Sequence, residues 1–180
     1  MKLPTSRTAA LPVATHIMTA LAPACKRIAL AGSLARESPV VGDIEIVCIP
    51  RIPTNLFGDP DPQQATMLDH TLADLIISGQ LAAPTLNGPK QKQFMLLPSG
   101  LTLDLFITSP QQWGVIYTLR VGPATFSRKI VTSRQYGGLL DPACVVREGR
   151  VYRLGEVQAT PEPEDFFRFL GGWVPPQHRT

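Results

Sequence analysis

The sequence predicts an α+β fold, and three observations support that prediction. Short apolar or alternating segments, typical of strands, stand among segments with helical spacing. The 18 prolines and 14 glycines divide the 180 residues into many short elements, which excludes a coiled coil or a helical repeat. Hydrophobic residues make up 44% of the chain, enough for a buried core, and no apolar run approaches the roughly 20 residues of a membrane span.

The first part of the chain is expected to form a strand core with helices. Ile17 and Leu21 fall on one stripe at helical spacing, whereas Ile44 and Ile46 alternate with acids as in a strand. Ser33 is a good helix N-cap directly after a short apolar strand. The expected elements are a helix over 11–24, a strand over 27–32, a helix over 33–38, a strand over 42–50, a Pro-rich loop over 51–62, a helix over 63–80, and a hairpin of strands over 91–97 and 101–107.

The second part of the chain is expected to be a small lobe of helices and a hairpin. Gly122 separates two helical segments, and Glu148-Gly149 is a hairpin turn between apolar segments. Residues 108–110 are therefore the natural boundary, with one domain over 1–109 and a second over 110–180. The elements expected in the lobe are helices over 110–119 and 123–131, a hairpin over 144–154, and a last short helix over 161–170.

Charge and cysteine usage limit the partners and the compartment. The net charge of +3 is modest, but residues 115–160 hold seven Lys and Arg against three Asp and Glu, which permits a nucleic-acid partner. The three cysteines are widely spaced and form no zinc motif, so free thiols in a reducing cytoplasm are the simplest interpretation. The first 30 residues lack a basic start followed by an unbroken apolar stretch, so we expect no secretory signal. We expect a monomeric cytoplasmic protein of bacterial or phage origin.

Three acidic residues are the first candidate site. Asp43 and Glu45 share one face of the expected strand, about 6–7 Å apart along it, and carboxylates this close repel each other unless a cation lies between them. Asp104 lies in the middle of a strand between two leucines, where an unpaired carboxylate is costly. If the strand of Asp104 pairs beside residues 42–50, the three acids converge.

An anion-binding turn is the second candidate site. Gly32-Ser33 follows a strand and opens a helix, so that backbone N–H groups point outward without partners. Arg36 lies one turn further on and presents a forked donor. Magnesium held by the acids would bridge a triphosphate bound by Ser33 and Arg36, and would lower the pKa of an attacking hydroxyl.

The stretch 31–47, Ala-Gly-Ser-Leu-Ala-Arg-Glu-Ser-Pro-Val-Val-Gly-Asp-Ile-Glu-Ile-Val, resembles the palm motif of family X DNA polymerases, the group of polymerase beta. Residues 103–108, 114–126 and 164–179 are similar to its third-acid strand, its nucleotide cradle and its C-terminal helix and tail. The resemblance covers 11–180 and is closest to minimal members. It implies a nucleotidyltransferase palm, a mixed sheet with helices on one face, followed by a lobe that contacts nucleotide and DNA.

The resemblance also implies roles for residues. Asp43, Glu45 and Asp104 would be catalytic and would hold two Mg²⁺ ions, or Mn²⁺ in their place, although Glu45 stands where well-known members carry Asp. The activity implied is that of a DNA polymerase, which adds dNMP from dNTP to a primer 3′-hydroxyl, with short gap filling in DNA repair as its task. The residues implied in nucleotide binding are Gly32, Ser33, Arg36, Gly42, Leu119, Arg120, Gly122, Ala124 and Ser127.

Basic residues outside these sites are the candidates for binding DNA, because phosphate contacts dominate DNA affinity. They are Lys90, Lys92, Arg128, Lys129 and Arg134. Two alternatives remain open. The same palm would serve a nucleotidyltransferase with another acceptor, such as RNA, protein or an untemplated DNA end. A degenerate palm, suggested by Glu45, would leave a DNA-binding module without catalysis.

Overall fold

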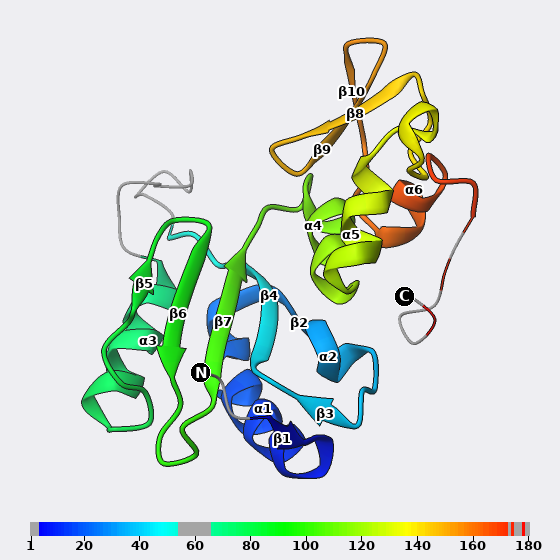
Figure 1. The fold of residues 1–180 in the computed structure, drawn as a ribbon. Helices are drawn as coiled ribbons and strands as arrows, with labels where there is room; N and C mark the ends of the chain where they lie inside the picture. The colour runs from blue at the N-terminus through cyan, green and yellow to red at the C-terminus, as the bar shows by residue number, and fades with distance from the viewer. Residues whose placement is uncertain (1–3, 54–65, 173, 175–177, 179–180) are drawn as a thin grey trace. The chain divides into compact units, whose positions relative to one another are not determined.

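The computed structural model describes residues 4–53, 66–172, 174 and 178. Its contacts divide the chain into two compact units, each containing helices and strands, so the α+β class is confirmed (Figure 1). Unit 1 consists of Met1–Leu30 and Pro39–Ile107, and unit 2 of Ala31–Ser38 and Thr108–Thr180. The short segment 31–38 thus groups with the C-terminal half, although the chain on both sides of it belongs to unit 1.

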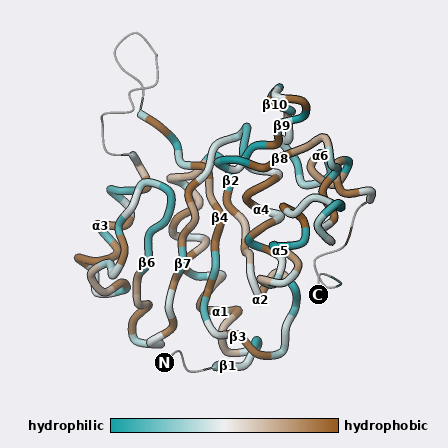
Figure 2. The backbone as a smooth tube through the Cα atoms, turned by 45° about the horizontal axis from the view of Figure 1, so that its top comes forward, coloured by the Kyte–Doolittle hydropathy of each residue, from teal (hydrophilic) through white to brown (hydrophobic). Residues whose placement is uncertain are grey.

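Unit 1 is built on a five-stranded mixed sheet of order β2-β4-β7-β6-β5. The two central strands, β4 and β7, pair in parallel, and every other neighbouring pair is antiparallel. Both central strands are mainly hydrophobic, whereas β6 is mainly hydrophilic (Figure 2). The strands are β2 (Cys25–Leu30), β4 (Ile44–Pro50), β5 (Leu86–Asn87), β6 (Gln91–Met95) and β7 (Thr102–Ile107).

Two helices of unit 1 lie on one face of this sheet (Figure 1). Helix α1 (Arg7–Leu21) begins four residues before the predicted helix, because the Ser6 hydroxyl accepts from the Ala9 N–H and caps it. Helix α3 (Met67–Ile77) begins at a capping box of Thr66 and Asp69. The short helix η1 (Ala22–Ala24) and the two-stranded sheet of β1 (Thr5–Ser6) and β3 (Val40–Val41) complete the unit.

Unit 2 packs short helices and a small sheet around its own core. The predicted hairpin is present as β8 and β9, and a third strand, β10, extends it. The core includes Val115, Phe126, Ile130, Leu140, Val151 and Phe166. The elements are α2 (Gly32–Ala35), α4 (Trp113–Val121), α5 (Ala124–Val131), η2 (Arg134–Tyr136), β8 (Cys144–Arg147), β9 (Arg150–Arg153), β10 (Glu156–Gln158) and α6 (Pro163–Phe167).

Several other predictions can be compared with the described residues. Cys25, Cys48 and Cys144 are buried free thiols, as predicted. A hydrogen bond between the first two lowers the pKa of Cys25 and raises that of Cys48. Most of the predicted Pro-rich loop over 51–62 lies outside the described residues. Within the described part of the chain, no helix is long and apolar enough to cross a membrane.

Candidate active site

Two of the three acids of the first candidate site lie on one face of the sheet in unit 1. Glu45 on β4 is the register partner of Asp104 on β7, and register partners on neighbouring strands point to the same face. Asp43 lies in the bend directly before β4, two residues ahead of Glu45. The predicted convergence of the acids requires the strand of Asp104 to pair beside the strand of Glu45, and this pairing is present.

This face is opposite to the one that α1 and α3 cover. Lys92 alternates along β6 with Gln93, the register partner of Asp104. The Lys92 ammonium lies 3.1 Å from a carboxylate oxygen of Asp69, on α3. Lys92 thus points to the helices, and Gln93 and Asp104 point away from them. Glu45 and Asp104 therefore lie on the sheet face opposite to α1 and α3.

Asp104 is held by two glutamines of the neighbouring strand. Its side chain is only 6% exposed. Its Oδ1 accepts from the Gln93 amide at 2.8 Å and from the Gln91 amide at 3.4 Å. Neutral amide donors orient a carboxylate without adding a cationic charge beside it. The sequence analysis missed both glutamines, because their role depends on strand register that no local pattern specifies.

The donor set fits a hard divalent cation by its chemistry. Carboxylate oxygens are the ligands that Mg²⁺ prefers, and here two carboxylates share one sheet face while a third, that of Asp43, directly precedes the strand of one of them. Among the residues that the structure describes, no three His, Cys, Asp or Glu side chains already form a metal-binding group. The fit therefore depends on the chemical type of the ligands and on the sheet face that Glu45 and Asp104 share. The residues that would hold the metal are Asp43, Glu45 and Asp104.

The Gly-Ser turn of the second candidate site belongs to unit 2. Gly32 has a φ of 58°, a conformation that glycine adopts without strain, and it opens the four-residue helix α2. The Ser38 N–H donates to the Ser33 carbonyl and closes the turn. The Ser33 hydroxyl is buried and has no hydrogen-bond partner among the described residues. A buried hydroxyl without a partner costs about 1–3 kcal/mol, which an incoming acceptor would relieve.

Arg36 joins this turn to the segment predicted to cradle sugar and base. One guanidinium nitrogen, Nη1, donates to the Val121 carbonyl at 2.7 Å, at the end of α4. Leu119, Arg120 and Gly122 surround that position in the chain. Two predicted nucleotide-binding segments, 85 residues apart in sequence, are therefore neighbours within unit 2. The contact occupies one of the five N–H groups of the guanidinium.

Three more of the residues predicted to bind nucleotide, Gly122, Ala124 and Ser127, lie at the junction of α4 and α5. The Ser127 hydroxyl donates to the Leu119 carbonyl at 2.6 Å. A Cβ at Gly122 would lie 2.6 Å from a ring carbon of Phe126, so only glycine permits this close approach. Ala124 is exposed at the start of α5. Gly42 belongs to unit 1, directly before Asp43, and has open space at its Cβ position.

The basic residues predicted to bind DNA differ in how exposed they are. Lys90 is exposed, but the Lys92 side chain is 12% exposed and also donates to the Asn87 amide oxygen. Burial opposes the ionisation of Asp69, yet hydrogen bonds from Thr66 and the Lys92 ammonium outweigh it and lower the pKa of Asp69. Lys92 thus ties β6 to α3, and its charge is already engaged within unit 1.

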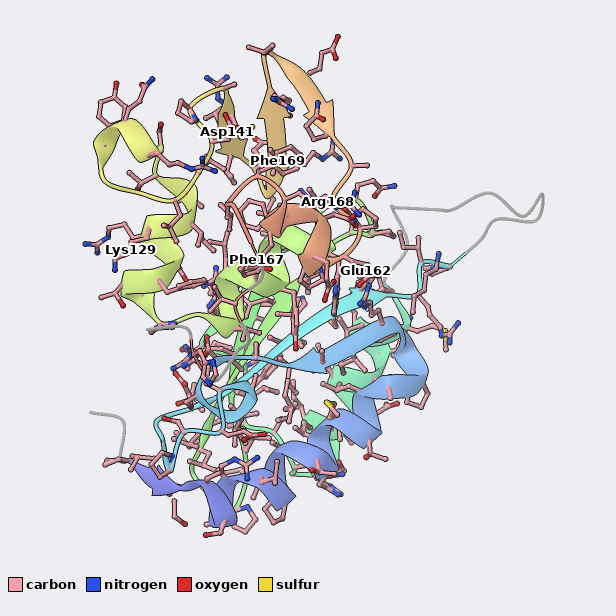
Figure 3. All side chains as sticks on the ribbon, turned by 90° about the vertical axis from the view of Figure 1, so that its right-hand side faces the viewer. Lys129, Asp141, Glu162, Phe167, Arg168 and Phe169 are labelled. Atoms are coloured by element: carbon pink, nitrogen blue, oxygen red, sulfur yellow. The ribbon has the colours of Figure 1, made fainter. Side chains whose placement is uncertain are left out.

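The three remaining basic residues are exposed in unit 2. Arg128 and Lys129 lie in the last turn of α5, and Arg134 opens η2. Figure 3 shows the Lys129 side chain extending outward from α5. Their charges are available to a ligand outside the protein.

An apolar pocket of unit 1 lies apart from the acids. Its volume is about 400 Å³, and it is formed by α1 and the turn after β6 in unit 1. His16 and Gln80 at its wall share a hydrogen bond of 2.9 Å. None of the three acids lines it. The candidate site is therefore defined by its carboxylates and not by this cavity.

Comparison with known proteins adds no relative. No protein-family model matches the chain, and no curated protein matches it. The resemblance to family X DNA polymerases therefore depends on the residues and motifs quoted above.

Proposed function

We propose that this protein transfers a nucleotidyl group from a dNTP to the 3′-hydroxyl of a DNA primer, with short gap filling as its task. The observation that carries the proposal is the parallel register of Glu45 with Asp104, with Asp43 two residues before Glu45 at the start of the strand. Acid-x-acid on one strand and a third acid in register on the next is the arrangement that the resemblance to family X polymerases requires. The position of Arg36 beside the end of α4 supports the nucleotide-binding part of the proposal.

The residues of the chain would divide the work as follows. Asp43, Glu45 and Asp104 would hold Mg²⁺, which when bound offsets phosphate charge and favours the deprotonated hydroxyl. Ser33, whose hydroxyl lacks a partner among the described residues, would donate to a phosphate oxygen. Asp104 would accept the proton of the 3′-hydroxyl. A bond forms between the 3′-oxygen and the α-phosphorus, the bond to pyrophosphate breaks, and pyrophosphate leaves.

The choice of DNA as acceptor depends on charge. The 11 residues before Leu139 contain three exposed cations and no Asp or Glu. The cations are Arg128, Lys129 and Arg134. Exposed cations attract a phosphate backbone and make its binding dependent on salt. The three cations therefore favour a polyanionic acceptor over a small neutral one.

Primer extension with an acid variant tests the proposal. The substrate is a labelled primer on a gapped template with dNTP and Mg²⁺, and the variant is Asp104→Asn, which keeps the oxygen that accepts from Gln93. We expect extension by the wild type and a loss of about 100-fold or more in the variant, since removing one group that stabilises developing charge has effects of this size. Asp74→Asn, an exposed acid of α3, is the matched control and should extend normally.

The outcomes separate the candidate functions. Equal extension by wild type and Asp104→Asn would contradict the proposed role of the acids. Labelled dNTP and NTP offered with RNA and with protein acceptors test the acceptor. Transfer to one of those, with none to DNA, would keep the reaction type and reject DNA as the acceptor.

A further inference from the structure

One exposed aromatic side chain in unit 2 has no role in the fold or in the proposed chemistry. Tyr136 is 80% exposed, and it is the one exposed aromatic residue among those that the structure describes. It belongs to the segment Thr132–Leu140, here called the Tyr136 loop, which follows α5. An exposed tyrosine ring offers its faces to a partner outside the protein, and tyrosine is common at interfaces.

The Tyr136 loop is held in one conformation by its backbone. The Leu139 N–H donates to the Lys129 carbonyl at 2.8 Å, which joins the end of the loop to the last turn of α5. Leu140 and Thr132 are joined by a second bond of 3.0 Å. A Cβ at Gly138 would lie 1.9 Å from the Thr132 carbonyl oxygen, so the loop requires glycine there. The exposed ring is therefore presented on a fixed support.

Positive charges accompany the ring. Arg134 lies two residues before Tyr136, and its Nε donates to the Leu139 carbonyl at 3.1 Å, across the loop. Arg128 and Lys129 are exposed in the turn of α5 to which the loop is joined. No Asp or Glu occurs between Ala124 and Leu140. The surface combines an aromatic platform with three cations and no carboxylate of its own segment.

A single strand of DNA fits this combination. Proteins that bind single strands use cations along the backbone and aromatic rings on which bases stack. A duplex keeps its bases stacked inside, so an exposed ring finds no base face there. A protein partner would need acidic groups to pair with the three cations on this surface. It would not need a planar group to stack on the exposed ring.

We infer that the Tyr136 loop binds single-stranded DNA, with the Tyr136 ring stacked on a base while Arg128, Lys129 and Arg134 contact phosphates. The choice of DNA as the nucleic acid rests on the proposed function. The contact with the Tyr136 loop goes beyond that function, which does not specify it. Unpaired template in a gap is the strand that would be present.

Oligonucleotides with and without bases test this contact. A fluorescent strand of about a dozen nucleotides is titrated with protein, in parallel with a strand of the same length made of abasic sugars. We expect the wild type to bind the strand with bases about 10-fold more tightly, the factor that corresponds to one stacking contact. Tyr136→Ala should lower the affinity for the strand with bases to that for the abasic strand, and leave the latter unchanged.

Two controls keep the test specific. Tyr136→Phe keeps the ring and should bind like the wild type. Leu154→Ala removes another exposed side chain of unit 2, 84% exposed, and should have no effect. Arg128→Gln should weaken binding of both strands alike and reduce the dependence on salt, with a change in slope of about 0.7.

The result that overturns the inference is a Tyr136→Ala protein that still prefers the strand with bases as the wild type does. Equal loss on both strands would also overturn it, since the ring would then act without a base. These titrations need no transfer reaction. If the protein shows the Tyr136 effect but does not extend a primer, this inference stands and the proposed function is rejected. If the protein extends primers without the Tyr136 effect, the proposed function stands and this inference is rejected.

Discussion

The candidate residues of the two units are held in different ways. In unit 1, the carboxylate of Asp104 accepts from the side chains of Gln91 and Gln93. In unit 2, Arg36 and Ser127 instead donate to backbone carbonyls near the end of α4. Asp104→Asn keeps an oxygen that accepts from Gln93 and should change stability little, whereas truncation of the unit 2 donors leaves carbonyls without partners and should lower stability.

The largest effect that would test this contrast is expected from Gly114→Ala in unit 2. A Cβ there would lie 2.3 Å from the Glu162 carbonyl oxygen and 2.5 Å from that of Thr160. Because backbone cannot move aside as a side chain can, we expect a loss of about 3 kcal/mol in the free energy of unfolding. Urea denaturation measures it, and hydrogen exchange should show the amides of α4 losing protection.

A glycine of unit 1 supplies the control for that experiment. Gly42 has no atom within 4 Å of its Cβ position, so Gly42→Ala should leave the free energy of unfolding nearly unchanged. If Gly114→Ala unfolds at the same urea concentration as Gly42→Ala, α4 does not pack against the segment of Thr160 as the structure shows.

Arg36→Ala is expected to have the next largest effect. The Val121 carbonyl would lose a charged donor at the C-terminus of α4, where a cation also interacts favourably with the helix dipole. Hydrogen bonds to charged groups contribute about 2 kcal/mol, and we expect a loss of that size in urea denaturation. Arg168→Ala, which removes a 77% exposed arginine of unit 2, should cost far less. Equal losses for the two variants would show that Arg36 does not anchor α2 to α4.

Sequence reasoning identified the strands that carry the candidate site. The alternation around Ile44 and Ile46 has the period of a strand, and it correctly placed Glu45 on the face opposite to those isoleucines, whereas Asp43 lies in the bend before the strand. The strand of Asp104 was found for the same reason. Strands β1, β3, β5 and β10 were missed, because two or three residues are too few to show a period.

The rest of the site depended on contacts between distant segments. Lys92 was expected to contact DNA, and its partner Asp69 lies 23 positions earlier on a helix that the sequence could not place on the sheet. Segment 31–38 looked like part of the N-terminal domain, because its contact with Val121 is not encoded by any local pattern. A local sequence pattern predicts a single helix or strand, whereas each of these contacts joins two elements that are distant in sequence.

Ser127→Ala is expected to have a smaller effect. The Ser127 hydroxyl holds the Leu119 carbonyl at 2.6 Å, and loss of a neutral hydrogen bond costs about 1 kcal/mol. Thermal unfolding should therefore show a modest decrease in Tm. Thr125→Ala, an exposed position on the same helix, is the control and should not change Tm. A decrease in nucleotide affinity without any change in Tm would mean that Ser127 contacts the ligand and not α4.

The smallest effect is expected in unit 1, from the ion pair of Asp69 and Lys92. Hydrogen bonds from Thr66 and the charge of Lys92 lower the pKa of Asp69 against the opposing effect of burial. A folded pKa below the unfolded value of about 3.9 means that the ionised carboxylate stabilises the fold above that pH. This contribution is lost as the pH falls through the folded pKa. Because the Asp69 side chain is 37% exposed, we expect only about 0.5 kcal/mol.

Urea denaturation of the wild type and Asp69→Asn at two pH values measures this contribution. Asn cannot ionise, so the difference in unfolding free energy between the two proteins should be present at about pH 7 and should shrink toward about pH 2.5. Asp74→Asn, on the same helix and exposed, should show no such dependence on pH. A difference that stays the same at both pH values would mean that Asp69 acts through its hydrogen bonds with Thr66 alone, and that the sheet and α3 are joined by packing without a contribution from charge.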